Sequence, residues 1–358
     1  MNRDYFIYNI KKNKHKLMLF GSIMILIIVC ITAFLVFKKD IFKTSFNDNI
    51  QSTKYVLADN IIDANSQGEV ILYNSSNGKI TDSLNLEDNF LIDMSDDLKE
   101  LYLLNNSNKE LHIISVKNNK IKDNVINMDI KQSLINFTSF DYDNGNIALL
   151  SDDSESFIIK AKDSSAKKIQ TNTGYSVDNF KIVKDNLIFT SGEYICSTSL
   201  LSNTNNEILK IHIGEQSSYI HEISDKLFIH NNFGMSRGIS IILDIDPSTL
   251  YINDMKKYSI PTNTFISNSN DSRIYFNEVS DNDSAKRQMI KYSYIEDFVE
   301  NGAYPIESNS ILNNSNSYGS LGYVYYKDNS KITIFNIKSN EIDLEIDSKG
   351  NFFAPIYE

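Results

Sequence analysis

The chain has 358 residues and a formal net charge of −11 at pH 7. Residues 1–40 contain seven basic and two acidic side chains and so carry +5, which leaves −16 for the remainder. A surface of that sign repels nucleic-acid phosphates, so we exclude DNA and RNA as partners. Cys30 lies in an apolar run and Cys196 is the only other cysteine. No disulfide framework is therefore expected, and an apolar core must hold the fold.

An uncharged apolar run extends from Leu17 to Phe37. Its 21 residues span about 30 Å as a helix, which matches the hydrocarbon core of a bilayer. The alternative is a cleaved signal peptide, whose apolar core is usually about 7–15 residues long and ends in a small-residue cleavage site. Here Lys38 and Lys39 follow Phe37 directly. We therefore predict an uncleaved transmembrane helix.

Basic residues are denser before this run than after it. Arg3, Lys11, Lys12, Lys14 and Lys16 precede it, and Lys38, Lys39 and Lys43 follow. This bias favours a cytoplasmic amino terminus. We expect a single-pass protein of the cell membrane with four parts: a cytoplasmic tail (1–16), a transmembrane helix (17–37), a linker (38–54) and an extracellular domain (55–358). The abundance of Asn, Lys and Ile is typical of a bacterial genome rich in A and T.

Beyond the linker, short strands with period-two alternation recur between polar turns. In one unit Leu101–Leu104 and Glu110–Val116 flank the turn Asn105–Lys109. The third strand of successive units is predicted to begin near Glu69, Glu110, Ser156, Glu193, Gly238, Gln288 and Lys331. The mean spacing of about 44 residues suits four-stranded propeller blades. We predict an all-β fold, a seven-bladed β-propeller preceded by one transmembrane helix.

A strand at residues 351–357 follows the seventh unit and has no unit of its own. The first unit has a weak first strand, so the extra strand is expected to complete it and close the ring. The alternative architecture is a pair of β-sandwiches.

Three stretches resemble the YVTN/WD40-like propellers. Ser95–Leu103 is similar to the first half of the YVTN repeat, S-x-D-G-x-x-L-Y-V, and Asn270–Phe276 echoes it. Ile332–Ile342 resembles the second half, V-x-V-I-D-x-x-T-x-x-V. The resemblance covers the domain as a pattern and implies the propeller fold, although most turns lack the glycine of the repeat.

Recognisable catalytic motifs are missing from the sequence. The chain has no tryptophan, phosphate-binding glycine loop, CxxC, HExxH or GxSxG. We expect no cofactor and no metal, and interpret His112, His212, His221 and His230 as ordinary strand residues. Asp244, Asp246, Asp281 and Asp283 are interpreted as turn residues rather than calcium ligands, and Cys196 as a small buried apolar residue.

Two predicted loops are longer than the others, Asn231–Arg237 and Glu278–Arg287. They lie in the units that hold Arg237, Arg273 and Arg287, and Arg3 is the only other arginine of the chain. Aromatic, Met and Arg side chains are enriched at interface centres. We therefore predict a binding surface formed by Phe233, Met235, Arg237 and Arg287, and the next candidate is the channel mouth lined by Phe137–Tyr142 and Tyr219–Ile223.

We interpret the protein as a non-catalytic, membrane-anchored propeller that binds a protein or cell-envelope component. One alternative is a hydrolase or lactonase-like enzyme, and another is a ligand sensor coupled to a membrane partner. Carboxylates and histidines that meet at the channel mouth favour an enzyme, whereas a broad apolar patch favours a binding module.

Overall fold

The computed structural model describes residues 55–358, apart from several short gaps. These gaps are residues 131–135, 163, 202–207, 214–218, 224–225, 232–239, 259–261, 265, 268–272, 280–287, 295–303, 308–316, 329 and 340. Residues 55–358 form one compact unit. Within the described ranges, no helix has the length and apolar character needed to span a bilayer. The predicted transmembrane segment, residues 17–37, lies outside them.

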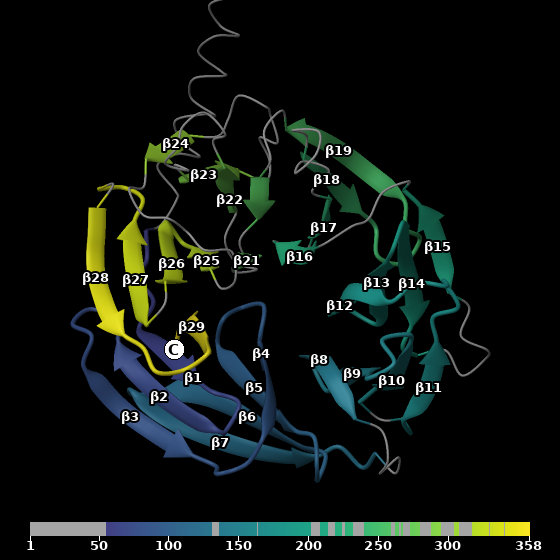
Figure 1. Cartoon of the computed structure of the whole chain (residues 1–358), viewed down its shortest axis with the longest axis horizontal. Coiled ribbons are helices and arrows are strands. Elements are labelled where there is room, and N and C mark those ends of the chain that lie inside the picture. Colours follow the sequence, from purple (N-terminus) through teal and green to yellow (C-terminus); the bar gives the residue numbers. More distant parts are fainter. Residues whose placement is uncertain are drawn as a thin grey trace, which may run out of the picture. The chain divides into compact units, whose positions relative to one another are not determined.

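The described residues form sheets of four or five strands, which we number in chain order (Figure 1). Sheet 1 contains β29 (Phe352–Ile356), β1 (Asn60–Ala64), β2 (Glu69–Asn74) and β3 (Ile80–Asn85). Sheet 2 contains β4 (Phe90–Met94), β5 (Glu100–Asn105), β6 (Glu110–Lys117) and β7 (Lys120–Asn127). Sheet 3 contains β8 (Phe137–Asp143), β9 (Asn146–Ser151), β10 (Ser156–Lys160) and β11 (Lys167–Gln170).

In the remaining sheets neighbouring strands also follow one another in the chain, except that the strand Ile266–Ser267 joins sheet 7 although it lies between two strands of sheet 6. Sheet 4 contains β12 (Val177–Val183), β13 (Asn186–Ser191), β14 (Tyr194–Ser199) and β15 (Leu209–His212). Sheet 5 contains β16 (Tyr219–Ile223), β17 (Lys226–Asn231), β18 (Ser240–Ile245) and β19 (Ile252–Tyr258). Sheet 6 contains β20 (Thr262–Thr264), β22 (Arg273–Val279), β23 (Gln288–Tyr294) and β24 (Tyr304–Glu307). Sheet 7 contains β21 (Ile266–Ser267), β25 (Ser317–Ser320), β26 (Tyr323–Asp328), β27 (Lys331–Asn336) and β28 (Glu341–Asp347).

Neighbouring strands pair antiparallel, except β21 and β25, which pair parallel. Consecutive sheets contact one another from sheet 1 to sheet 5, β16 of sheet 5 contacts β21 of sheet 7, and sheet 7 contacts sheet 6. Finally, β26 of sheet 7 contacts β29 of sheet 1. Figure 1 shows β4, β8, β12 and β16 nearest the centre of this circuit, with β7, β15 and β28 at its outside. Up-and-down four-stranded sheets that succeed one another around a centre define a β-propeller, and this is the fold of the described unit.

The core lies between the faces of consecutive sheets. On β5, Leu101 and Leu103 join a cluster shared with sheets 1 and 7, whereas Tyr102 and Leu104 join a cluster shared with sheet 3. Because successive side chains of a strand point to opposite faces of the sheet, a continuous apolar run buries side chains on both faces. A fully buried side chain of this size contributes about 1.5–3 kcal/mol.

Tight hairpins separate the strands, and their asparagines adopt positive φ. The β6–β7 turn has φ of 53° at Asn118 and 56° at Asn119. The β8–β9 turn has 49° at Asn144 and 91° at Gly145. Positive φ at both central positions is the requirement of the type I′ hairpin, which Asn and Gly meet at low cost.

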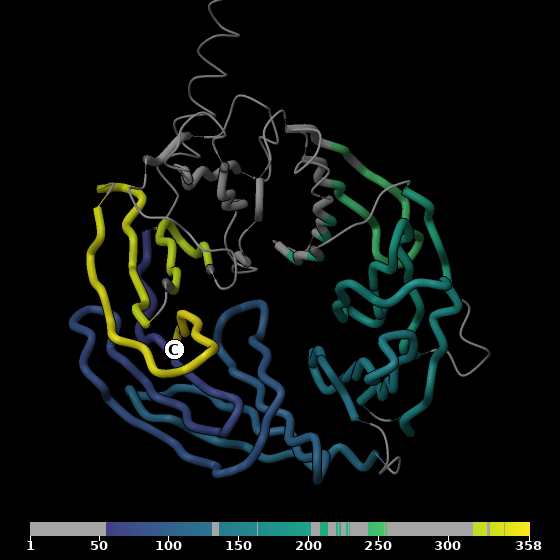
Figure 2. Tube along the Cα trace, viewed as in Figure 1, coloured from purple at the N-terminus to yellow at the C-terminus, as the bar shows by residue number. Residues whose placement is uncertain are grey.

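The carboxyl-terminal strand β29 lies in the first sheet. It pairs antiparallel with β1, with Ile62 opposite Ala354. Figure 2 shows the yellow end of the chain beside the purple beginning of the unit. The two ends of the unit are therefore joined by a β-ladder.

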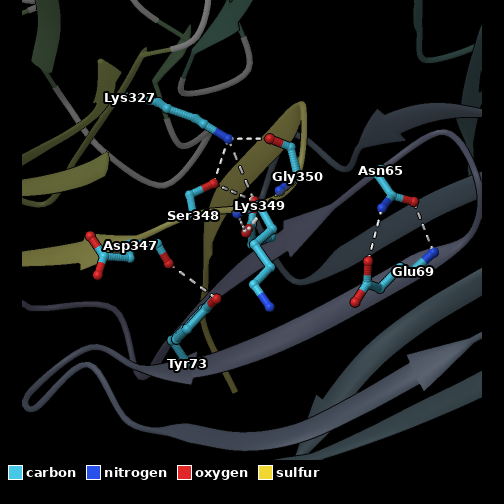
Figure 3. Close-up of polar contacts among 9 residues, drawn as sticks. Asn65, Glu69, Tyr73, Lys327, Asp347, Ser348, Lys349 and Gly350 are labelled. Carbon is cyan, nitrogen blue, oxygen red and sulfur yellow. Dashed lines mark hydrogen bonds and ion pairs between the residues drawn. The ribbon is translucent and has the colours of Figure 1, made fainter. Parts of the chain in front are cut away.

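Asp63 of β1 fixes the turn that leads into β29. Its carboxylate, fully buried, accepts hydrogen bonds from Ser348 Oγ at 2.8 Å, Lys349 N at 3.0 Å and Gly350 N at 3.2 Å. Figure 3 shows Lys327 donating from Nζ to Ser348 and to the carbonyl of Gly350. These contacts join sheets 7 and 1, and we assign them a structural role.

Candidate functional site

The most concentrated group of charges near the centre of the unit comes from sheets 2, 3 and 4. Asp93, Asp141 and Lys181 lie on β4, β8 and β12, which Figure 1 shows facing the centre. Each of the three residues lies near the end of its strand: Asp93 is one residue before the end of β4, and Asp141 and Lys181 are two residues before the ends of β8 and β12. Asp96, in the β4–β5 turn, completes the group. We call these four residues the inner-strand cluster.

Direct contacts connect the cluster across sheets. Nζ of Lys181 forms an ion pair with Oδ1 of Asp96, although the two residues are 85 positions apart in the chain. The carboxylate of Asp141 accepts a hydrogen bond from the backbone N–H of Ile182, next to Lys181. Sheet 4 is therefore tied to sheet 2 by an ion pair and to sheet 3 by a hydrogen bond.

Asp93 contributes to the same network from β4. Its Oδ1 accepts the backbone N–H of Met94 at 2.8 Å, and its charge and that of Asp141 repel each other. The side chains of Lys181 and Asp96 keep 17% and 29% of their surface accessible. Water therefore still reaches the cluster, and the charges are not sealed in an apolar core.

Burial and mutual repulsion shift the pKa values of the acids upward. Burial, followed by the charge of Asp141, raises the pKa of Asp93 well above its usual value. Burial also raises the pKa of Asp141 to about 6, although Lys181 opposes this shift. Burial therefore disfavours the ionised form of both acids.

The neighbouring acids favour the charged form of Lys181. Burial disfavours its charged form, but Asp96, Asp141 and Asp93 outweigh that effect and raise its pKa. A lysine held in its charged form cannot act as a nucleophile or as a general base.

Further polar residues lie beside the cluster. Tyr102 donates its hydroxyl to Oε2 of Glu100 at 3.1 Å, and its ring contacts Tyr142 edge to face, with centroids 5.0 Å apart. Burial raises the pKa of Tyr142 and that of Asp143, which follows it on β8. These groups keep the surroundings polar and rich in acids.

The two histidines whose side chains are described form local pairs on their own sheets. Nδ1 of His112 lies 2.9 Å from Oδ2 of Asp123, and Nε2 of His212 lies 2.8 Å from Oε2 of Glu193. Both partners come from a neighbouring strand or its turn, in agreement with the interpretation of these histidines as ordinary strand residues. His221 and His230 lie on β16 and β17.

Other residues singled out in the sequence have structural surroundings. Cys196 is fully buried, and burial raises the pKa of its thiol to about 12, which confirms the interpretation of a buried apolar residue. Asp246 accepts hydrogen bonds from Ser248 N and Thr249 N at 2.8 and 3.0 Å, as a turn residue does. In the part of the chain that the structure describes, no three His, Cys, Asp or Glu side chains are grouped as metal ligands.

The predicted binding surface is outside the described residues. Phe233, Met235, Arg237 and Arg287 all fall in the gaps, as do most residues of the two long loops. Arg273 lies on β22, which extends to Val279 and so includes the first two residues of the predicted loop Glu278–Arg287.

The strand Phe137–Tyr142, our second candidate, does carry a member of the inner-strand cluster, Asp141. Asp93, Asp96 and Lys181 were not among the residues predicted from the sequence to form a site. A usable signal was present, because each of β4, β8 and β12 places a charged residue among its last three positions.

Comparisons with known proteins show the fold and nothing narrower. No protein-family model matches the chain, and no curated protein matches it. A functionally unknown protein from Desulfotomaculum acetoxidans is similar with a TM-score of 0.55 and 10% identity, over 84% of this chain and 99% of that one. Apo AztD from Citrobacter koseri is similar with a TM-score of 0.52 and 11% identity, over 84% of this chain and 97% of that one. The WD40 domain of Neurospora crassa Pan2 has a TM-score of 0.48 and 10% identity, over 75% of this chain and 81% of that one. We draw no conclusion from a TM-score this low. At these identities the similarity is one of β-propeller architecture alone.

Proposed function

We propose that the chain is a membrane-anchored, seven-bladed β-propeller that binds a protein or cell-envelope component outside the membrane and catalyses no reaction. Each of the sheets serves as one blade, and β29 closes the ring. The apolar run at residues 17–37 is the anchor, and the acidic character of the rest of the chain keeps the domain soluble beside it.

One observation carries the non-catalytic assignment. In the inner-strand cluster, the Lys181 ammonium pairs with Asp96 and the Asp141 carboxylate accepts the Ile182 N–H. Groups whose charges and hydrogen bonds are satisfied by one another stabilise the arrangement of the sheets and are not available to bind a substrate. The binding surface is then on the loops, with Phe233, Met235, Arg237 and Arg287 as the proposed contacts.

The test has two arms. Protease added to intact, wall-stripped cells should remove the region after Lys43, and protection of that region would exclude an external domain. Full-length protein cross-linked in its own membranes should then be recovered with a partner that Arg237→Ala fails to retain. Equal recovery with the wild type and the variant would reject the assigned surface.

A second function is favoured by a specific feature, two acids on neighbouring inner strands whose pKa values burial raises, that of Asp93 well above its usual value and that of Asp141 to about 6. Such a pair is the acid–base apparatus that a hydrolase requires. Hydrolysis of ester or lactone substrates by the purified protein, lost in both Asp93→Asn and Asp141→Asn, would establish this alternative and replace the first proposal.

A further inference from the structure

The turns between strands lie at two opposite faces of the unit, because antiparallel strands alternate in direction. The β4–β5 turn, the β6–β7 turn and their counterparts in the other sheets belong to one face. Glu358, which follows β29, accepts the backbone N–H of Asn118 and Asn119 in the β6–β7 turn at 2.8 and 2.7 Å. The backbone N–H of Tyr357 donates to the carbonyl of Leu98 in the β4–β5 turn at 3.0 Å. We call this side of the unit the entry face.

The chain enters the unit at this face. The backbone N–H of Val56 donates to the carbonyl of Leu321 in the β25–β26 turn at 3.0 Å. Nζ of Lys338, in the β27–β28 turn, lies 5.7 Å from the centre of the Tyr55 ring. The first residues of the unit are therefore fixed to two turns of the entry face.

A short segment of chain separates this point from the apolar run of the sequence. Seventeen residues, 38–54, lie between Phe37 and Tyr55. A flexible chain of that length has a root-mean-square span of only about 20–25 Å. With residues 17–37 across a bilayer, the entry face is the part of the unit that is tethered nearest to the lipid.

Exposed apolar side chains are concentrated at the entry face. Of the ten exposed large apolar side chains among the described residues, seven lie in the entering segment, in turns of this face or within two residues of such a turn. They are Tyr55, Val56, Ile80, Leu201, Leu209, Tyr251 and Ile342. Tyr251 in the β18–β19 turn keeps 69% of its surface accessible, and Leu201 in the β14–β15 turn keeps 60%. Apolar groups gathered on one side of a domain are typical of a contact surface.

The charges of the two faces differ as well. Exposed lysines lie in the turns of the entry face or directly beside them, namely Lys79, Lys117, Lys162, Lys184 and Lys338. The turns of the opposite face carry the exposed acids Glu87, Asp152, Asp153, Glu155 and Glu193. The entry face also has acids, but Asp96 and Asp97 form ion pairs with Lys181 and Lys99. An anionic surface therefore attracts the entry face and repels the opposite one.

Aromatic and aliphatic side chains beside lysines are typical of proteins that lie on a bilayer, where apolar groups enter the headgroup region and ammonium groups contact phosphates. We propose that the entry face rests on a bilayer that contains anionic lipid, with Tyr251 and Leu201 among the headgroups and the turn lysines at lipid phosphates. This inference rests on the membrane anchor proposed for residues 17–37. The strands β17 and β22 end at the opposite face, where the two long loops begin, so a partner bound there does not compete with the lipid.

Tryptophan fluorescence tests the contact, because the chain has no tryptophan of its own. Full-length Tyr251→Trp is reconstituted into vesicles of equal parts phosphatidylcholine and phosphatidylglycerol, brominated on the acyl chains near the headgroup. Its emission should fall by about half relative to unbrominated vesicles, because bromine quenches tryptophan that lies in the interface. Tyr175→Trp is the matched control, since Tyr175 is 49% exposed in a turn of the opposite face, and its emission should not change. Absence of quenching in Tyr251→Trp, or equal quenching in both variants, overturns the proposal.

An alkaline carbonate wash of the same vesicles separates the face contact from the anchor. Protein that stays with the vesicles but shows no quenching retains the anchor and rejects the contact of the entry face with lipid. Protein that the wash releases rejects both. If Tyr251→Trp is shielded from iodide in native membranes but is not quenched in the lipid vesicles, a membrane protein covers the face and the lipid contact is rejected.

The lysines are tested in the Tyr251→Trp background. Lys79→Glu combined with Lys184→Glu should reduce the quenching, because both side chains are exposed and their reversal places acids against the lipid phosphates. Lys349→Glu is the control for charge reversal, since Lys349 is exposed in a turn of the opposite face, and it should leave the quenching unchanged. Quenching that is the same in all of these variants would overturn the contact between lysines and phosphates.

Discussion

Nζ of Lys327 lies 3.7 Å from Oδ1 of Asp63, and this ion pair joins the last sheet of the chain to the first. The side chains retain only 10% and 0% of their accessible surface. Because Asp63 also accepts hydrogen bonds from Ser348, Lys349 and Gly350, one carboxylate organises the whole turn before β29.

Asp63→Ala should destabilise the domain strongly. It leaves the largely buried Lys327 ammonium without its carboxylate and removes three hydrogen bonds, and breaking a buried pair of this kind costs about 3–5 kcal/mol. Urea unfolding of the full-length protein measures the change. Glu345→Ala is the matched control, because it breaks the exposed pair between Lys331 and Glu345 (2.9 Å) and should leave the unfolding midpoint unchanged. Equal midpoints for the two variants would contradict the structural role of Asp63.

Deletion of residues 351–358 should destabilise sheet 1 and, with it, the unit. The deletion removes β29, exposes the edge of β1 and takes Phe353, Ala354 and Ile356 from the core cluster. Loss of the Phe353 and Ile356 side chains alone costs about 5–10 kcal/mol, which is comparable with the 5–15 kcal/mol stability of a typical domain, so the melting transition should fall sharply or disappear. Calorimetry of the full-length and truncated proteins measures this. Lys349→Ala, which changes only an exposed side chain in the preceding turn, should melt like the wild type. A truncated protein that also melts normally would show that β29 is dispensable.

Most strand positions could be predicted from the sequence, because each buried strand alternates and each hairpin carries polar turn residues. The third strands begin at Glu69, Glu110, Ser156, Tyr194, Ser240, Gln288 and Lys331, within two residues of the predicted positions. The division of residues 262–267 could not be predicted. Two residues of β21 pair parallel with sheet 7 while the three of β20 join sheet 6, and such short segments carry no periodic signal.

The side-chain contacts of the inner-strand cluster could not be predicted from the sequence either. The charge of Lys181 is visible in the sequence, but its ion pair with Asp96 depends on how three separate sheets are placed around a centre. No spacing along one strand encodes that contact. Asp93 looks like any half-buried strand residue until Asp141 is brought beside it.

Cys196 should be unreactive in the folded protein. Its side chain is fully buried, and burial raises the pKa of the thiol to about 12, so almost no thiolate is present at pH 7.5. In a Cys30→Ser background, maleimide should label less than a few per cent of native protein and nearly all protein in denaturant. Mass spectrometry quantifies both. Rapid labelling of the native protein would contradict the burial of this thiol.

The proposed binding surface can be tested residue by residue once a partner has been recovered. Arg237→Ala and Phe233→Ala should each weaken binding by about 2 kcal/mol or more, roughly thirtyfold, because Arg and aromatic side chains at an interface centre dominate its free energy. Titration of the partner onto the full-length protein measures the dissociation constant, and circular dichroism checks that each variant is folded.

Lys168→Ala is the control for loss of a positive charge. Lys168 is exposed on β11, far along the chain from the two long loops, and its substitution should leave the affinity within about twofold. If Arg237→Ala and Phe233→Ala bind as tightly as the control, the surface lies elsewhere. The loops beside the inner strands β8 and β16 are then the next to substitute, since both strands face the centre of the unit (Figure 1). A general loss of affinity in all three variants would instead indicate a charge effect without a defined contact surface.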